Sequence, residues 1–363
     1  MAAASFGKNA VRIDRHRPVR LMIVDDSLVA RTALKGMVEG DDRIEVAAVT
    51  NTAENALEAL RSRRVDVILL DLDMPGMGGL DALPRIIERA RGARILVVSS
   101  LTVDGAEHTL AALSLGAADT LPKPDSRSFR EDYRDVLIGR IRALGQAAGN
   151  GRLTPQPAGA APLRPSLRRP PGVLAIGAST GGIHALTSLF AALPPRLGIP
   201  ILITQHLPAA FMPAFARQLR SASGYDALIA EDGMPLEPDR ILIAPGYASL
   251  MLAGRHGQLT ARLDCTPAES GCMPSVDPMF ASLADEIGDR ALGVVLSGMG
   301  RDGALGAARI VAAGGSIFAQ DEASCAVWGM PRAVAEAGLA SAILPPREIA
   351  CRILASLGTP ACR

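Results

Sequence analysis

The stretch VLAIGAS, residues 173–179, is an apolar run that ends on a serine. Runs of this length that are rich in Val, Ile and Leu are typical of strands buried on both faces of a parallel sheet. Two later runs have the same form: ILITQH at 201–206 ends on a histidine, and VVLSGMGRD at 294–302 reaches an aspartate through a glycine-rich loop. Because functional groups collect beyond the carboxyl ends of parallel strands, we expect these three side chains to share one crevice.

A serine, a histidine and an aspartate together make a hydrolytic triad. In that chemistry Ser179 would attack a carbonyl carbon, His206 would take the serine proton, and Asp302 would orient the imidazole. The chain order Ser, His, Asp does not argue against this, because the same geometry occurs in several orders. Two competitors are weaker: His184 lies one helical turn beyond the glycines, and Cys325 has no neighbouring histidine.

The segment GASTGG, residues 177–182, also permits other interpretations. Its glycines predict a bend from strand to helix, with the turn at Gly177 and close backbone approach at the two later glycines. Such a loop could cradle a phosphate, or Ser179 and Thr180 could simply cap the helix. The segment lacks G-x-G-x-x-G spacing and the acidic residue expected about 20 positions later, which argues against a dinucleotide site.

The composition excludes several classes of protein. The chain has 363 residues, enough for two domains, and its 48% hydrophobic and 21% charged residues are usual for a globular protein. A net charge of +1 gives no basic surface for nucleic acid or membrane, and no apolar run reaches the roughly 20 residues of a bilayer span. The five cysteines lack metal or disulfide spacing, and the N-terminus lacks a secretory apolar core, so we expect a cytoplasmic protein without direct membrane insertion.

Strand and helix signals alternate twice along the chain, which predicts an α/β fold with two doubly wound parallel-sheet domains. We expect a flexible extension at 1–17, a first domain at 18–145, a linker rich in Pro, Gly and Arg at 146–171, a second domain at 172–358 and a tail at 359–363. Strands are expected at 21–24, 45–49, 67–70, 95–98 and 119–121, and then at 173–176, 200–204, 240–243 and 292–296. Helical stretches include 52–63 and 106–115.

Acidic residues follow two strands of the first domain. Asp25 and Asp26 come after its first strand, and Asp71 comes after its third. Clustered carboxylates repel one another unless a cation neutralises them, and oxygen ligands of this kind suit Mg²⁺. Asp71 could act as a nucleophile toward a phosphoryl group, while Ser99 and Lys123, at the ends of the last two strands, would contact the phosphoryl oxygens. The alternative is that Asp26 and its neighbouring serine only cap a helix.

The first domain resembles the receiver domain of two-component response regulators, which has a flavodoxin-like fold. The resemblance is carried by VDDS at 24–27, LLDLDMPGMGGLD at 69–81, VVSS at 97–100 and LPKP at 121–124. It implies that Asp71 accepts the phosphoryl group, that Asp25, Asp26 and the backbone carbonyl of Asp73 join Asp71 in holding Mg²⁺, and that Ser99 and Lys123 sense phosphorylation. It also implies a cis peptide candidate at Lys123–Pro124. Thr120 stands where receivers usually carry a switching aromatic residue.

The second domain resembles the catalytic domain of chemotaxis-type protein-glutamate methylesterases. The motifs are GASTGG at 177–182, ITQHLPAAF at 203–211, EDGMPLEPDRILIAPG at 231–246, PSVDPMF at 274–280, LSGMGRDGA at 296–304 and QDEASCAVWGMPRAV at 320–334. The resemblance implies that Ser179 is the nucleophile, His206 the base and Asp302 the orienting carboxylate. It further implies that the Met299 N–H is an oxyanion donor, that Thr180 lines the site, and that this domain needs no cofactor.

The sequence departs from the methylesterase pattern in two places. Gly271, Cys272 and Met273 occupy the place where the family usually has a His-Arg pair before PSVD, and losing an arginine removes a bidentate donor for substrate. Arg301 stands beside Asp302 in place of a usual asparagine. We expect both departures to affect substrate binding or rate rather than the triad.

Together the resemblances imply a phosphorylation-activated enzyme that hydrolyses glutamate methyl esters on chemoreceptor helices, releases methanol and also deamidates glutamine. Its partners would be methylated chemoreceptors and a histidine kinase, and not nucleic acid. The rival interpretations are a transcriptional response regulator, for which 172–358 shows no helix-turn-helix signal, a nucleotide-dependent enzyme that uses GASTGG for phosphate, and a catalytically weak relative that only binds partners.

Overall fold

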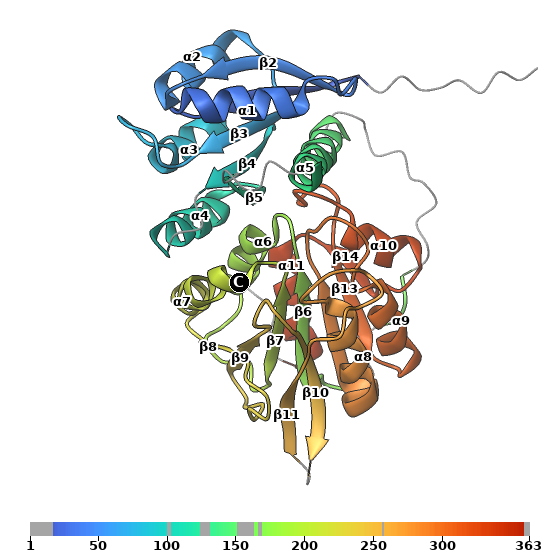
Figure 1. Ribbon diagram of the computed structural model, residues 1–363. Coiled ribbons are helices and arrows are strands. Elements are labelled where there is room, and N and C mark those ends of the chain that lie inside the picture. The colour runs from blue at the N-terminus through green and yellow to red at the C-terminus, as the bar shows by residue number, and fades with distance from the viewer. Residues whose placement is uncertain are drawn as a thin grey trace, which may run out of the picture.

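The computed structural model describes residues 17–99, 103–123, 131–150, 163–165, 169–255 and 258–358. Two parallel sheets, each flanked by helices, make up these residues (Figure 1). The α/β fold with two parallel-sheet domains, predicted from alternating strand and helix signals, is therefore confirmed. No helix in the described ranges is long and apolar enough to cross a membrane.

The first sheet has the strand order β2-β1-β3-β4-β5, and all its pairings are parallel. Its strands are β1 (Val19–Val24), β2 (Ile44–Thr50), β3 (Val67–Asp71), β4 (Arg94–Ser99) and β5 (Asp119–Pro122). The helices that alternate with them are α1 (Leu28–Val38), α2 (Ala53–Ser62), α3 (Gly79–Arg89), α4 (Val103–Leu115) and α5 (Glu131–Asn150). Every residue of β3 is buried, as expected for a central strand covered on both faces.

Local signals begin the first helices where the sequence places polar caps. The Ser27 side chain accepts a hydrogen bond from the Ala30 N–H at the start of α1, and Thr52 does the same for Asn55 at the start of α2. Asp25 and Asp26 therefore lie just before a capped helix, at the carboxyl end of β1. The helix α5 continues to Asn150, inside the segment expected to be a linker.

The second sheet has the strand order β14-β13-β12-β6-β7-β9-β8, and all its pairings are parallel. Its strands are β6 (Val173–Ala178), β7 (Ile201–Gln205), β8 (Asp226–Ile229), β9 (Arg240–Ile243), β12 (Ala291–Val295), β13 (Ser316–Gln320) and β14 (Ala342–Leu344). A separate antiparallel hairpin joins β10 (Ser249–Arg255) to β11 (Gln258–Asp264). The flanking helices are α6 (Gly182–Phe190), α7 (Met212–Ser223), α8 (Val276–Ile287), α9 (Ala304–Ala312), α10 (Met330–Glu336) and α11 (Pro346–Ser356).

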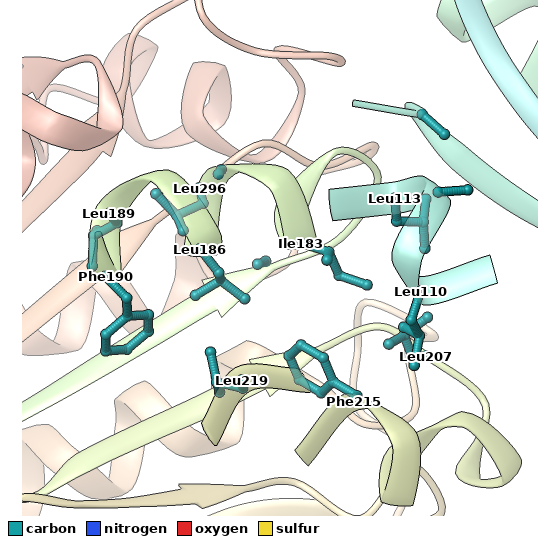
Figure 2. Packing of buried hydrophobic residues seen from close by; sticks show 14 of the residues in the cluster. Leu110, Leu113, Ile183, Leu186, Leu189, Phe190, Leu207, Phe215, Leu219 and Leu296 are labelled. Carbon is teal, nitrogen blue, oxygen red and sulfur yellow. The ribbon is translucent and has the colours of Figure 1, made fainter. Parts of the chain in front are cut away.

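An apolar contact joins the two sheet domains through α4. Leu110 and Leu113 of α4 belong to the same buried cluster as Ile183 of α6 and Leu207, the residue after His206 (Figure 2). Helix α4 packs against both α6 and α7. The receiver-like domain thus packs directly on the elements that follow β6 and β7, the strands that Ser179 and His206 immediately follow.

Candidate active site and phosphorylation site

Ser179 lies in the turn between β6 and α6. Its backbone N–H donates to the Ser297 carbonyl at 3.0 Å, and its own carbonyl accepts from Gly182 N–H at 2.8 Å. The left-handed residue of this turn is Gly181, with φ of 77°. The expectation that Gly177 makes the bend is wrong, because Gly177 is a strand residue: a Cβ there would lie 2.5 Å from the Val276 side chain, so glycine is needed for packing.

The loop after β12 comes close to Ser179. A Cβ built on Gly298 would lie 2.8 Å from the Ser179 Cβ, so the glycine allows this approach. Met299, the expected oxyanion donor, is the next residue, and its side chain is exposed. Arg301, the departure beside Asp302, is exposed as well.

His206 and Asp302 form a direct pair. The His206 Nε2 lies 2.8 Å from Asp302 Oδ2, and the carboxylate is almost completely buried. Asp302 also accepts hydrogen bonds from the Ser275 hydroxyl at 2.7 Å and the Val276 N–H at 2.8 Å. Burial alone would raise the pKa of Asp302, but these bonds and the histidine hold it below its usual range. The carboxylate is therefore kept ionised beside the imidazole.

The structure brings His206 and Asp302 into contact and places Ser179 at the cavity that His206 lines. Ser179 and His206 line one cavity with Gly181 and Gln205. Within the part of the chain that the structure describes, the Ser179 hydroxyl and His206 are not joined by a hydrogen bond, while His206 and Asp302 are. Gln205 fixes the serine turn, because its side-chain amide donates to the Ser179 carbonyl at 2.9 Å.

The receiver-like domain covers this cavity. It contributes Leu113, Ala117, Ala118 and Asp119 to the lining. The Thr180 hydroxyl, next to Ser179, donates to Asp119 Oδ2 at 2.8 Å, and the Gly181 N–H donates to the Ala118 carbonyl at 2.6 Å. A residue predicted to line the site thus binds the domain that covers it.

The two competitors for catalytic roles have other partners. His184 Nδ1 lies 3.0 Å from the Ser114 carbonyl of α4, so this histidine belongs to the contact between the domains. Cys325 is buried, and burial raises the pKa of its thiol to about 12, the opposite of an activated nucleophile. Its carbonyl accepts a bond from Arg94 at 2.9 Å, which is a second contact between the domains.

The predicted acidic cluster also forms. One carboxylate oxygen from each of Asp25, Asp26 and Asp71 lies within 4.8 Å of the others. Lys123 Nζ lies 2.6 Å from Asp71 Oδ2 and 3.8 Å from Asp25 Oδ2. Asp25 Oδ2 is buried and has no hydrogen-bond partner among the described residues. Burial, with the nearby Asp71 charge, raises the pKa of Asp25. An orphaned oxygen among carboxylates fits a hard cation such as Mg²⁺.

The remaining predicted residues of this site lie at the same sheet edge. Ser99 ends β4 and accepts a hydrogen bond from the Thr109 hydroxyl of α4 at 2.7 Å, and the Asp73 N–H donates to Asp71 Oδ1 at 3.1 Å. Thr120 is buried, and its hydroxyl has no partner within the described ranges. The cis peptide expected at Lys123–Pro124 involves a residue outside the described ones.

Sequence reasoning missed three residues at these sites. Ser275 precedes α8 and looks like an N-cap, which it is, so its bond to Asp302 carried no separate signal. Thr109 and Asp119 act across tertiary contacts, with the Ser99 hydroxyl and Thr180 respectively. The only available signal for Asp119 was its place at the start of a predicted strand.

Comparison with known proteins gives a consistent result for both halves. The family model for the CheB methylesterase matches residues 174–353, and the model for the response regulator receiver domain matches 21–132. A protein-glutamate methylesterase/protein-glutamine glutaminase of Azospirillum brasilense is 42% identical, over 92% of this chain and 91% of the relative. One from Paramagnetospirillum magneticum is 38% identical, over 92% and 94%. The solved CheB methylesterase catalytic domain of Thermotoga maritima is 34% identical with a TM-score of 0.50, covering 51% of this chain and 98% of that one.

Proposed function

The chain belongs to the CheB-type protein-glutamate methylesterase/protein-glutamine glutaminase family with a receiver domain, and from this we propose that it hydrolyses glutamate methyl esters on chemoreceptors under the control of phosphorylation. The same site would deamidate glutamine, because the side-chain amide is nearly isosteric with the ester. The observation that carries the proposal is the hydrogen-bonded pair of His206 and the buried Asp302, in which His206 lines the same cavity as Ser179.

The chemistry follows from the orientation of the histidine. His206 faces Asp302 with Nε2, so Nδ1 is the nitrogen that takes the Ser179 proton. The serine oxygen attacks the ester carbonyl, the protonated imidazole returns the proton to the leaving methoxide oxygen, and methanol departs. Water then hydrolyses the acyl-enzyme by the same route and restores Ser179. General-base catalysis of this kind contributes about 10²–10⁴-fold.

The developing oxyanion needs donors near Ser179. The Met299 N–H is our candidate, because Gly298 brings its loop against the serine. A donor of this type contributes on the order of 3–4 kcal/mol to the stability of the transition state. Thr180, the residue after the nucleophile, lines the same site.

We propose that the acidic cluster is the phosphorylation site. A carboxylate oxygen of Asp71 attacks the phosphorus of a phosphodonor, with Lys123 neutralising the phosphoryl charge and Ser99 donating a hydrogen bond to a phosphoryl oxygen. Mg²⁺ held by Asp25, Asp26, Asp71 and the backbone carbonyl of Asp73 would supply further charge neutralisation. The orphaned Asp25 oxygen supports this ligand set.

Control by phosphorylation would act through α4 and β5. The Ser99 hydroxyl is bonded to Thr109 of α4, and the same helix covers the cavity at Ser179. Lys123 already lies 2.6 Å from Asp71 Oδ2, so the movement would come from Ser99. A phosphoryl group on Asp71 that draws the Ser99 hydroxyl toward it would disturb the bond to Thr109 and loosen the contact between the domains. The polar part of that contact includes single hydrogen bonds such as the one from Thr180 to Asp119. A change of a few kcal/mol in the free-energy difference between the closed and open arrangements would be enough to break them.

The proposed partners are methylated chemoreceptor helices as substrate and a histidine kinase as phosphodonor, both met in the cytoplasm. The direct test is methanol release from purified methylated receptors by the full chain with Mg²⁺ and a phosphodonor. We expect release by the wild-type chain and none by Ser179→Ala. Equal release by both chains would remove serine from the mechanism, and no release by either would refute the esterase.

A further inference from the structure

A cysteine lies beside the proposed catalytic pair. Single ligand atoms of His206, Cys272 and Asp302 are all within 4.8 Å of one another. Cys272 is partly buried and belongs to the segment 271–273, where the sequence differs from the motif expected for the methylesterase family. The three residues come from different parts of the fold. His206 follows β7, Asp302 lies in the loop after β12, and Cys272 lies between β11 and α8.

Nitrogen, sulfur and oxygen donors in this combination form a ligand set for Zn²⁺. Zinc binds Cys, His and Asp in tetrahedral sites, with bonds of about 2.0–2.3 Å, so that neighbouring ligand atoms are roughly 3.5 Å apart. Three protein ligands leave the fourth position for water. The ligand atoms here all lie within 4.8 Å of one another, so their separations exceed that spacing by no more than about 1.3 Å.

The surroundings would hold such an ion. Ser275 and the Val276 N–H fix the Asp302 carboxylate at 2.7 and 2.8 Å, and this kind of outer support orients a metal ligand. The segment with Cys272 is linked to this support, because the Cys272 N–H donates to the Ser270 hydroxyl at 3.3 Å and that hydroxyl lies 3.3 Å from the hydroxyl of Ser275. The ionised Asp302 supplies negative charge for a cation.

We propose that His206, Cys272 and Asp302 form an inhibitory site for Zn²⁺ in this enzyme. If the ion binds His206 Nε2, the ring proton moves to Nδ1, which then cannot accept the Ser179 proton. If the ion binds Nδ1, it occupies the base directly. In either case the thiol proton is released to solvent and the enzyme loses its general base.

A catalytic role for the Cys272 thiol is less consistent with its environment. Burial and the Asp302 charge raise the pKa of the thiol, whereas reactive cysteines have a lowered pKa. The same negative charge that disfavours a free thiolate attracts a divalent cation. The acidic cluster of the receiver domain offers only oxygen ligands and suits Mg²⁺ instead.

Metal binding is tested first, because it does not depend on the proposed esterase activity. Full-length protein freed of metal is titrated with Co²⁺ as a probe for Zn²⁺, in excess Mg²⁺ to occupy the acidic cluster. We expect the near-ultraviolet charge-transfer absorption of a cobalt–thiolate bond, competed away by Zn²⁺. It should disappear in Cys272→Ser and persist in Cys265→Ser, a matched control at an exposed cysteine of the same domain. Absorption that is absent from wild type, or unchanged in Cys272→Ser, would overturn the proposal.

Inhibition is tested second, and this part rests on the proposed function. Methanol release by each chain is expressed relative to its own rate without zinc. We expect the Zn²⁺ concentration for half inhibition to rise at least about tenfold in Cys272→Ser and to stay unchanged in Cys265→Ser. Equal inhibition of all three chains would contradict an inhibitory role for this site. If the wild-type chain binds cobalt through Cys272 but releases no methanol even in the absence of zinc, the esterase proposal is refuted and the metal-site proposal is retained.

Discussion

Each of the two sheets has a buried aspartate at the carboxyl ends of its strands, Asp25 in the first and Asp302 in the second, but the two carboxylates differ in their hydrogen bonds. Asp25 keeps one oxygen without a hydrogen-bond partner among the described residues, and burial raises its pKa. Asp302 binds His206, Ser275 and the Val276 N–H, and its pKa is held low. The free oxygen of Asp25 has only the Lys123 ammonium at 3.8 Å, so a bound cation would stabilise it further, whereas the carboxylate of Asp302 is already held by hydrogen bonds as a fixed charge.

This difference separates the two proposed roles. The sheet edge that carries Asp25 is suited to bind a metal ion and to accept a phosphoryl group. The sheet edge that carries Asp302 needs no ligand to hold this carboxylate in place, and the carboxylate can keep the His206 imidazole oriented. Changes at one edge should therefore disturb one chemistry and leave the other intact.

The largest effect is expected at the second edge. Ser179→Ala and His206→Ala should each lower methanol release by about 10³-fold or more, and the double variant should lose little beyond either single one, because the residues act as a unit. Both variants should still accept a phosphoryl group at the first edge. Additive losses in the double variant would indicate independent roles.

Asp302→Asn tests whether the satisfied carboxylate orients the histidine. The amide keeps the shape but can donate to His206 Nε2 and so favour the wrong tautomer. Losses of about 10²–10⁴-fold in kcat are expected. Circular dichroism and thermal unfolding check that the variant is folded. A folded variant with near wild-type kcat would show that the charge and donor pattern of Asp302 are unimportant.

Asp71→Asn tests the first edge. It keeps the shape of the side chain and removes the nucleophilic oxygen, so a labelled phosphodonor with Mg²⁺ should no longer modify the protein. Methanol release should persist at its unstimulated rate, since the second edge is intact. Undiminished labelling would place the phosphoryl group on another residue.

Asp119→Ala tests the contact that joins the edges. It removes the charged acceptor of the Thr180 hydroxyl, a bond of about 1.5–3 kcal/mol, together with the 2.8 Å ion pair between the same carboxylate oxygen and Arg140. If the Thr180 bond keeps the unphosphorylated chain closed, the expected activation is roughly 10- to 150-fold. Glu107→Gln is the matched control, because it weakens only the exposed Arg217–Glu107 pair of the same interface and should change the rate little. Equal effects of the two variants would contradict a specific role for Asp119.

The smallest effect is expected at the departure from the family pattern. If Cys272 and Met273 replace a substrate-binding pair, Met273→Arg should chiefly lower KM for a receptor helix, because an arginine adds a bidentate donor. Hydrolysis of a small model ester should barely change. Similar changes on both substrates would show that the position supports the fold or the catalytic centre.

The sequence predicted the strand ends well because buried parallel strands are continuous apolar runs. The runs that end at Ser179, His206 and Asp71 are fully or almost fully buried, so their pattern was unambiguous. The half-buried hairpin β10–β11 and the short edge strands β8 and β14 were missed, because partly exposed or very short strands lack such runs. The fully buried strand β13 was missed as well, because its sequence SIFAQ begins and ends on polar residues and holds only two large apolar ones.

The contact between the domains could not be predicted in detail. Asp119 and Thr180 are 61 residues apart, and neither has a local signal for the other. Docking depends on the shapes of two finished surfaces, with Leu110 and Leu113 on one side and Ile183 and Leu207 on the other (Figure 2). The sequence predicted only a linker rich in Pro, Gly and Arg between the two domains, which leaves their relative placement open.

We propose that the receiver domain holds the Ser179 cavity closed until Asp71 is phosphorylated. The most direct measurement compares methanol release from methylated receptors by the fragment 172–363 and by the full chain, each with and without phosphodonor and Mg²⁺. We predict that the fragment is faster than the unphosphorylated full chain and insensitive to phosphodonor, while the full chain is stimulated. A fragment that is equal to or slower than the unphosphorylated full chain would contradict occlusion and show that the receiver instead promotes substrate binding.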